Sequence, residues 1–322
     1  MSKQKWVIGL VVLLSVFGLA LYPFLSSSLA VSRLVDEMGA RTNPEDKQSE
    51  SMKHVVLIAQ ELDNPFWRMI EEGAKQRAAL SNMEIQYVGP IRINAEEQLK
   101  LLEKAIASKP DAILAQGIND PAYNELVSKA MDQGIPVVTV DSDAPSSRRL
   151  AYVGTDNLEA GKRMGELVLS HAELEGKIGV IIGSEQAYNQ KLRLEGFESV
   201  MAEHPDYEVV DVRSSNISRI EAARQAQEML RTHPDLTAMI GFSAWDAVGM
   251  VEALQSEHRE VRVFGFDDVE ATKRAIAEGK IAASLVQQPR EIGATAVAVL
   301  QQIFEDKPFP ATAFTSTQVI RP

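Results

Sequence analysis

Cysteine is absent from this chain of 322 residues, and histidine is scarce. Without a thiol, the chain has no disulfides, no thiolate metal sites, no cysteine nucleophile and no lipidated cysteine. The histidines also lack the spacing that brings two imidazoles onto one helix face to bind zinc, so no metal site is predicted. They are His54, His171, His204, His233 and His258.

The motifs of nucleotide chemistry and hydrolysis are missing as well. The chain has no GxGxxG after its first predicted strand, no GxxxxGK[ST] and no GxSxG. These motifs supply phosphate-binding turns or a nucleophilic serine. Paired acids such as Asp141 with Asp143 have no nucleophile or electrophilic metal assigned beside them. We therefore expect no catalytic residues, no cofactor and no enzymatic activity.

Runs of basic residues are also missing, and the net charge is −12. Nucleic-acid affinity rests on clustered lysine and arginine, so no nucleic-acid partner is expected. A transcription regulator would further need a helix-turn-helix head of roughly 50 to 60 residues before the first predicted strand. An apolar span and an acidic segment occupy that part of the chain instead.

The amino terminus predicts export across a membrane. Lys3 and Lys5 precede the uncharged span Trp6–Leu25, and Ser28–Ala30 has the small-x-small pattern of a signal-peptidase site. The span exceeds the about 7–15 apolar residues of a usual signal peptide and matches the roughly 20 that cross a bilayer. Cleavage after residue 30 and a retained anchor both remain open, and we favour the anchor. Either way the folded part is expected outside the cytoplasm, in the cell envelope or periplasm.

A polar tether is expected at residues 31–52, followed by a folded α/β part. There, short apolar runs alternate with amphipathic segments, a pattern typical of βα units around parallel sheets. Predicted strands cover residues 55–59, 84–88, 112–115, 136–140, 151–153, 177–182, 208–212, 238–241, 261–265, 281–286 and 317–320. Predicted helices cover residues 65–80, 95–108, 121–133, 157–171, 189–203, 217–232, 244–255, 269–278 and 290–304. Two series of roughly 100 residues predict two similar lobes, joined by several crossings that permit closure over a ligand.

One stretch, Val55–Ile70, combines an apolar run, a polar bend and two aromatic residues. The run predicts a buried parallel strand, and Asn64 with the proline after it favours a bend followed by a helix. Phe66 and Trp67 would then lie with Gln60 at the carboxyl end of the strand, where open α/β sheets bind ligands. A second interpretation is that the two aromatic side chains only pack the helix onto the sheet.

Polar residues recur directly after the predicted strands. Each by itself has an ordinary interpretation as a solvated loop residue or a helix cap. Together they supply the carboxylates and amides that a neutral polyhydroxyl ligand requires, with aromatic rings for its C–H face. They are Gln60, Gln116, Asp141, Ser142, Asp143, Ser243, Asp267 and Gln287.

Six segments carry a family resemblance. They are DNPFW at 63–67, IPVVTVDSDAP at 135–145, YVGTDNLEAG at 152–161, RLEGF at 193–197, GFDD at 265–268 and ASLVQQPREIG at 283–293. As a set they are specific: residues 53–322 resemble the ribose-binding family of periplasmic sugar-binding proteins, the substrate-binding components of ABC importers. This family is related to the ligand-binding cores of LacI-type repressors.

The resemblance implies a type I periplasmic-binding-protein fold of two Rossmann-like lobes, joined by a three-strand hinge and binding sugar between them. Residues 53–155 and 289–314 would form the N-terminal lobe, and residues 156–288 and 315–322 the C-terminal lobe. By position, the resemblance implies ligand hydrogen bonds for Asn64, Asp141, Arg193, Asp267 and Gln287, and packing on the sugar for Phe66 and Trp67. It also implies that Gln60, Gln116 and Ser243 line the site with side chains that vary in the family.

Some features leave alternatives open. Arg193, taken alone, fits a surface salt bridge on a helix. Ser142 stands where the ribose binders have an arginine, and Ile217 where they have a third aromatic residue. The loss of a planar cation and a stacking surface predicts another pentose, a hexose, a polyol or a related small molecule rather than ribose.

Two functions follow from the resemblance. The first is binding of a sugar and its delivery to the permease of an ABC importer. The second is a sugar-sensing receptor that signals to a membrane histidine kinase, which a retained anchor would suit. The partners expected are thus a sugar, a permease or kinase, and the membrane through the N-terminal segment. We expect the soluble part to be a monomer.

Overall fold

The computed structural model describes residues 51–171 and 175–322, and residues 52–322 form one compact unit. The predictions for residues 1–30 and for nearly all of the tether lie outside the described residues. Within the described ranges, no helix has the length and apolar character needed to cross a membrane.

Two six-stranded sheets define two lobes. The N-terminal lobe contains β1 (Lys53–Ile58), β2 (Met83–Val88), β3 (Ala112–Gln116), β4 (Val137–Val140), β5 (Ala151–Thr155) and β11 (Thr312–Thr315). The C-terminal lobe contains β6 (Gly176–Ile182), β7 (Tyr207–Ser214), β8 (Leu236–Gly241), β9 (Arg262–Phe266), β10 (Ala283–Gln287) and β12 (Thr317–Ile320).

The two sheets share one topology. Their orders are β11-β5-β4-β3-β1-β2 and β12-β10-β9-β8-β6-β7, so β1 to β5 occupy the same places as β6 to β10. Described strand pairs are parallel except for β10 with β12. The predicted α/β fold of two lobes with mainly parallel sheets is confirmed. Because the carboxyl ends of parallel strands share one edge, the loops after the strands gather there in each lobe.

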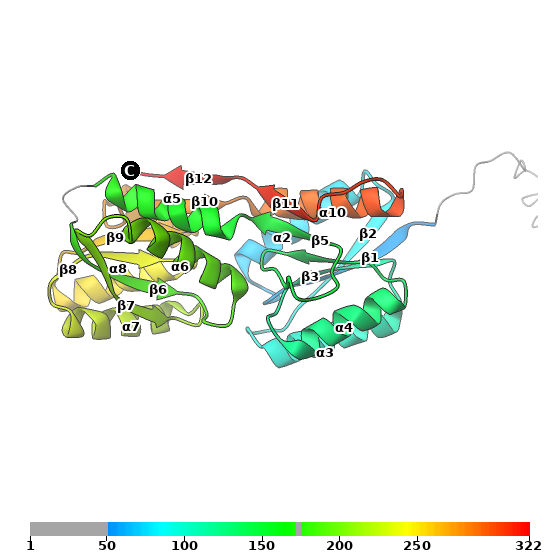
Figure 1. Cartoon of the computed structure of the whole chain (residues 1–322), viewed down its shortest axis with the longest axis horizontal. Helices are drawn as coiled ribbons and strands as arrows, with labels where there is room; N and C mark the ends of the chain where they lie inside the picture. Colours follow the sequence, from blue (N-terminus) through cyan, green and yellow to red (C-terminus); the bar gives the residue numbers. More distant parts are fainter. Residues whose placement is uncertain (1–50, 172–174) are drawn as a thin grey trace, which may run out of the picture. The chain divides into compact units, whose positions relative to one another are not determined.

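Helices cover both faces of each sheet (Figure 1). In the N-terminal lobe these are α2 (Pro65–Ala78), α3 (Ala95–Ser108), α4 (Pro121–Asp132) and α10 (Pro289–Phe304). In the C-terminal lobe they are α5 (Asn157–Leu169), α6 (Tyr188–Met201), α7 (Arg219–Thr232), α8 (Asp246–Glu257) and α9 (Glu270–Ala277). Each face has its own apolar core: the residues of α2 and α10 pack on one side of the first sheet, and those of α3 and α4 on the other.

Glycine allows a close helix pair on one face of each sheet. In the N-terminal lobe, a methyl group on Gly73 of α2 would lie 2.0 Å from the Arg290 carbonyl oxygen, and one on Gly293 of α10 would lie 2.0 Å from that of Ile70. In the C-terminal lobe, a methyl group on Gly196 of α6 would lie 2.0 Å from the Leu158 carbonyl oxygen. Any larger residue would push the helices apart.

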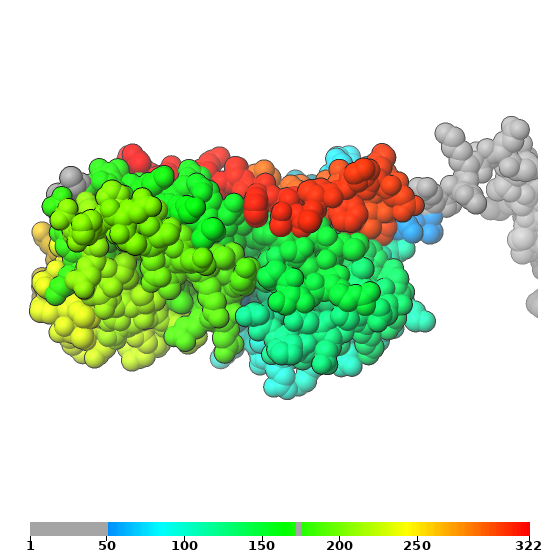
Figure 2. Space-filling view, viewed as in Figure 1, coloured from blue at the N-terminus to red at the C-terminus, as the bar shows by residue number. Residues whose placement is uncertain are grey.

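The chain passes between the lobes three times: from β5 to α5, from β10 to α10 and from β11 to β12. Figure 2 shows the last passage as the red C-terminal segment that runs over both lobes. Each crossing takes only one residue, so the two sheets are joined by short connections of the kind that act as hinges.

One strand was not predicted, and several predicted element boundaries differ from the structure by one or two residues. Strand β11 was missed because it has only four residues and is largely exposed on the edge of its sheet, so no apolar run marks it. The helix predicted from residue 217 begins at Arg219 instead, where Ser218 caps it through the Glu221 amide. Ile217 lies in the preceding loop with a φ of 57°.

Candidate functional site

A small inner pocket of about 60 Å³ lies where the carboxyl ends of the strands of both lobes meet. Ten of the eleven predicted site residues line it. They are Gln60, Asn64, Phe66, Trp67, Gln116, Asp141, Arg193, Ser243, Asp267 and Gln287. They come from strand ends, loops and helices far apart in the sequence, and the fold brings them together.

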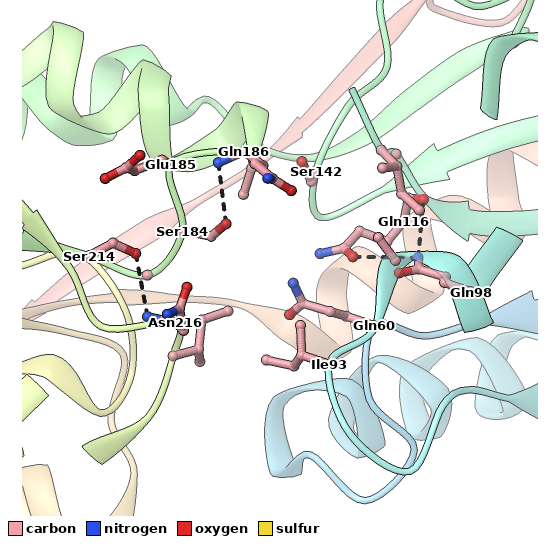
Figure 3. A pocket seen from close by; sticks show the side chains of 16 residues that line it. Gln60, Ile93, Gln98, Gln116, Ser142, Ser184, Glu185, Gln186, Ser214 and Asn216 are labelled. Carbon is pink, nitrogen blue, oxygen red and sulfur yellow. Dashed lines mark hydrogen bonds between the residues drawn. The ribbon is translucent and has the colours of Figure 1, made fainter. Parts of the chain in front are cut away.

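A larger outer pocket of about 570 Å³ adjoins the inner one and shares Gln60, Gln116, Ala187 and Ile217 with it. Ser142, the remaining predicted residue, lines this outer pocket. In Figure 3, Gln60, Gln98 and Gln116 of the N-terminal lobe lie across the opening from Ser184 and Asn216 of the C-terminal lobe. The two pockets together form a cleft between the lobes.

Two aspartates occupy equivalent places in the two lobes. Asp141 follows β4 with a φ of 64°, and Asp267 follows β9 with a φ of 61°. Each donates its amide N–H to the neighbouring strand, to Val153 O at 3.1 Å and to Leu285 O at 2.8 Å. Aspartate tolerates this left-handed backbone better than most residues do. Neither side chain caps a helix, so that interpretation was wrong.

Both carboxylates are buried and have altered acidity. Desolvation raises the pKa of Asp141 to about 6, although the positive charge of Arg193 and a hydrogen bond from Gln116 Nε2 at 3.1 Å oppose the shift. Desolvation also raises the pKa of Asp267, and Arg193 again opposes it. Two carboxylates with one guanidinium favour a neutral ligand that donates hydroxyl hydrogens over an anionic one.

Arg193 is the cation of the site. It is 2% exposed, so the surface salt-bridge interpretation was wrong. It donates to Asn157 Oδ1 at 2.8 Å, to the Phe242 carbonyl at 2.8 Å and to Gln287 Oε1 at 2.9 Å, and its guanidinium lies 3.9 Å from the centre of the Phe266 ring. A guanidinium has five N–H groups, so two remain for other acceptors.

Gln287 links the cation to an acid and to the hinge. Its Oε1 accepts from Arg193 and from Thr155 Oγ1 at 2.8 Å, and its Nε2 donates to Asp267 Oδ1 at 3.2 Å. Thr155 ends β5 and Gln287 ends β10, so the two residues stand at two of the three crossings. The polar network of the pocket is therefore continuous with the connections between the lobes.

Comparison with known proteins identifies the family. Residues 55–308 match the periplasmic binding protein domain. The chain belongs to the periplasmic binding protein family. The match confirms the resemblance predicted from the six sequence segments.

Three relatives illustrate the family's range. The ribose import binding protein RbsB of Escherichia coli is 25% identical over 252 residues, which cover 78% of this chain and 84% of RbsB. The structure of GanP, a glucose-galactose binding protein from Geobacillus stearothermophilus, is 39% identical with a TM-score of 0.81, covering 84% of this chain and 97% of GanP. A chain of the XylFII-LytSN complex is 31% identical with a TM-score of 0.78, covering 84% and 97% of the two chains.

The aromatic pair of this periplasmic binding protein has two roles. Trp67 is 1% exposed and belongs to the core under α2, while Phe66 is half-buried and packs against that core. Both also line the inner pocket. The Asn64 side chain already makes two hydrogen bonds within the protein. Its Oδ1 caps α2 by accepting from the Phe66 amide at 3.0 Å, and its Nδ2 donates to Glu61 Oε2 at 3.2 Å.

Two serine hydroxyls in the cleft have no hydrogen-bond partner within the described residues. Ser142 Oγ, in the outer pocket, and Ser243 Oγ, in the inner one, are both buried. An unpaired buried hydroxyl is costly, so each is available to a ligand.

Sequence reasoning missed several residues of the site. Asn189 and Gln190 of α6 line the inner pocket, and Asn157 holds Arg193 and donates to Tyr152 Oη at 3.1 Å. All three lie in the first turn of a helix, where polar residues are commonly caps, and so they gave no separate signal. The YVGTDN segment around Asn157 and the RLEGF segment of α6 were the sequence signals nearest to them.

Proposed function

We propose that this protein binds a neutral sugar or a closely related polyol in the cleft, outside the cytoplasm, and delivers it to an ABC importer. The observation that carries the proposal is that Asp141 and Asp267, from separate lobes, line one pocket together with Arg193, whose positive charge acts on both carboxylates and which Gln287 links to Asp267 by hydrogen bonds. Carboxylates accept from the hydroxyls of a sugar, and a guanidinium donates to its oxygens.

The relatives support this substrate class. GanP is described as a glucose-galactose binding protein, RbsB as a ribose import binding protein, and other relatives as D-apiose import binding proteins. We infer that the site residues of this chain are Gln60, Asn64, Phe66, Trp67, Gln116, Asp141, Ser142, Arg193, Ser243, Asp267 and Gln287. The charge of the pocket supports neutral sugars over sugar phosphates and sugar acids, because two buried acids face one cation.

Closure of the lobes is part of the proposal. The three crossings would act as the hinge, and a ligand held by Asp141 on one side and Asp267 on the other would favour the closed form. The lobe boundaries that we propose are residues 53–155 with 289–315, and residues 156–288 with 316–322; the last boundary lies one residue later than the resemblance implied, because Thr315 pairs with Thr155 of β5.

The importer is favoured over the sensor as partner, because RbsB and the D-apiose relatives are described as import binding proteins. One observation supports the sensor: a relative 31% identical to this chain was solved as the XylFII-LytSN complex. Retention of the N-terminal segment as a membrane anchor remains a proposal, and sequencing the mature amino terminus tests it.

A thermal-shift screen of residues 52–322 tests sugar binding. The panel contains D-glucose, D-galactose, D-ribose, D-arabinose and D-allose, with D-glucose 6-phosphate as the anionic counterpart. At a hundredfold excess over the dissociation constant, a ligand stabilises by about 2.7 kcal/mol, or roughly 5 °C in Tm for a domain of this size. At least one neutral sugar should reach this shift, and the phosphate should not.

Asp267→Ala should abolish the shift. Its matched control is Asp268→Ala, the next acid along the chain, which is half-buried and lines neither pocket. A folded protein that responds to no sugar, or an Asp267→Ala protein that responds like its control, contradicts the proposal.

A further inference from the structure

We propose that Asp246 is a positioning residue that fixes the C-terminal wall of the cleft through Ser215, and that these hydrogen bonds, by holding Ile217 in place, affect which sugars fit. The part about sugar choice rests on the proposed function. Asp246 is among the lining residues of neither pocket, and so the ligand network described above does not account for it.

Asp246 joins two loops. It is the first residue of α8 and is 0% exposed. Its Oδ1 accepts from Ser215 Oγ at 2.6 Å, and its Oδ2 accepts from the Ser243 amide at 2.7 Å. Ser215 lies in the loop between β7 and α7, and Ser243 in the loop between β8 and α8, so one carboxylate holds both loops.

Burial of this carboxylate carries a cost. Desolvation raises the pKa of Asp246 to about 6 even though both of its oxygens accept hydrogen bonds. A neutral residue at this place would avoid the penalty. The two loops that the carboxylate holds in place account for its presence.

The surrounding backbone leaves Asp246 little freedom. A methyl group on Gly241, the last residue of β8, would lie 2.6 Å from Asp246 Cβ. One on Gly249 of α8 would lie 2.7 Å from the Arg219 carbonyl oxygen at the start of α7. The amino end of α8 is thus pressed against both the strand and the helix whose loops Asp246 bridges.

Ile217 is the strained residue of this wall. Its φ of 57° lies in the left-handed region, where a β-branched side chain is a genuine outlier. Its amide donates to Ser215 Oγ at 3.1 Å. Since the Ser215 hydroxyl uses its hydrogen on Asp246, its lone pairs remain to accept from Ile217. The hydrogen bonds therefore run in one direction, from the Ile217 amide to Ser215 Oγ and from Ser215 Oγ to Asp246. Together they hold the strained backbone of Ile217 in place.

Ile217 occupies the junction of the two pockets and lines both. A methyl group on Gly183 would lie 3.0 Å from Ile217 Cγ1 and 3.0 Å from Ser243 Cβ, so these three residues pack into one wall. Gln60 and Gln116, which also line both pockets, come from the N-terminal lobe. The position of Ile217 hence sets how far a substituent of the ligand extends from the inner pocket into the outer one.

The hydrogen bonds that join Asp246, Ser215 and Ile217 are called the brace below. Asp246→Ala and Ser215→Ala, made in residues 52–322, test whether the brace holds Ile217 in place. The first readout is amide hydrogen exchange of Ile217 in the ligand-free protein, which should accelerate at least about tenfold in both variants because the acceptor is lost or released. Asp246→Asn should keep the exchange slow. The side-chain oxygen of the asparagine can accept from the Ser243 backbone amide, and its side-chain NH₂ group can donate to Ser215 Oγ. Leu230→Ala, a core change in α7, serves as a control for general destabilisation.

The second readout is the ratio of the D-galactose and D-ribose dissociation constants, measured by calorimetry. Loss of one apolar wall contact changes selectivity by roughly tenfold or more. We expect this change in Asp246→Ala, Ser215→Ala and Ile217→Gly, and wild-type selectivity in Asp246→Asn and Leu230→Ala. Ile217→Gly accepts the left-handed backbone, so its effect isolates the side chain.

Each outcome decides one claim. A wild-type rate of Ile217 amide exchange in Ser215→Ala refutes the brace. This result decides the claim even if the Asp246→Ala protein does not fold. Faster Ile217 amide exchange, together with an unchanged ratio of the two sugar dissociation constants, refutes the specificity role of Ile217. If neither sugar binds the wild-type protein, the proposed function fails for these ligands and so does the specificity role, while the exchange experiment still decides the brace.

Discussion

Replacement of Asp141 by asparagine should stabilise the empty protein and weaken sugar binding at the same time. The change suits the site, because asparagine also tolerates the left-handed φ of 64° and its amide oxygen can accept from Gln116 Nε2 in place of the carboxylate. Shape and this hydrogen bond are kept, and the charge is removed.

The magnitude follows from the pKa. Burial raises the pKa of Asp141 from 3.8 to about 6. Because the folded value exceeds the unfolded one, the protonated group's contribution to stability is fully present below pH 3.8 and is lost as the pH rises through 6. The shift of about 2 units corresponds to roughly 3 kcal/mol at pH 8, as an upper value. Asp141→Asn should therefore gain about 1–3 kcal/mol over wild type at pH 8 and little at pH 3.8.

Urea denaturation of both proteins between pH 4 and 8 measures this difference. Buried Asp246 titrates in the same range but is present in both proteins, so its contribution cancels. Calorimetry with the best sugar should show binding weakened about ten- to a hundredfold, because a neutral acceptor replaces a charged one. A variant less stable than wild type at pH 8 would refute the reasoning, as would unchanged sugar affinity.

Other substitutions separate packing from binding. Trp67→Ala should lower the unfolding free energy by about 3–5 kcal/mol, because the side chain is fully buried. Phe66→Ala should lower it by roughly 1–2 kcal/mol, because Phe66 is only half-buried. Urea denaturation measures both values, and equal losses would contradict the assignment of Trp67 to the core and of Phe66 to its edge. Arg193→Met should lower the unfolding free energy by about 3–5 kcal/mol and abolish sugar binding, since three buried acceptors each lose a hydrogen bond and two buried carboxylates lose their cation, and Arg193→Lys should recover part of the stability. Gly293→Ala should lower the unfolding free energy by about 1–3 kcal/mol, because the new methyl group would lie 2.0 Å from the Ile70 carbonyl oxygen; a thermal melt unchanged from wild type would show that α2 and α10 pack less closely than described.

Much of the fold could be predicted from the sequence because parallel sheets covered on both faces require continuous apolar runs. Strand β3 is buried at all five positions and β4 at all four, and each has a single polar residue, Gln116 and Thr139. Strand β11 is largely exposed and pairs with β5 only at the edge, so its formation depends on tertiary contacts that no local pattern records.

The site was predictable to the extent that it follows from topology. Residues placed directly after parallel strands converge at one edge, which is why Asp141 and Asp267 were identified. Arg193 had a local interpretation as a surface residue, and only the packing of α6 on α5 shows that it is buried. Asp246 resembled an ordinary acid at a helix start, because its bond to Ser215 spans 31 residues.

The most direct test of the central claim is a crystal structure of residues 52–322 with the panel sugar that stabilises it most. We expect a sugar in the cleft that reaches into the inner pocket, with hydroxyls about 2.5–3.0 Å from the carboxylates of both Asp141 and Asp267 and with Phe66 and Trp67 against its C–H face. A sugar bound outside this cleft, or one held by the residues of a single lobe, would contradict it.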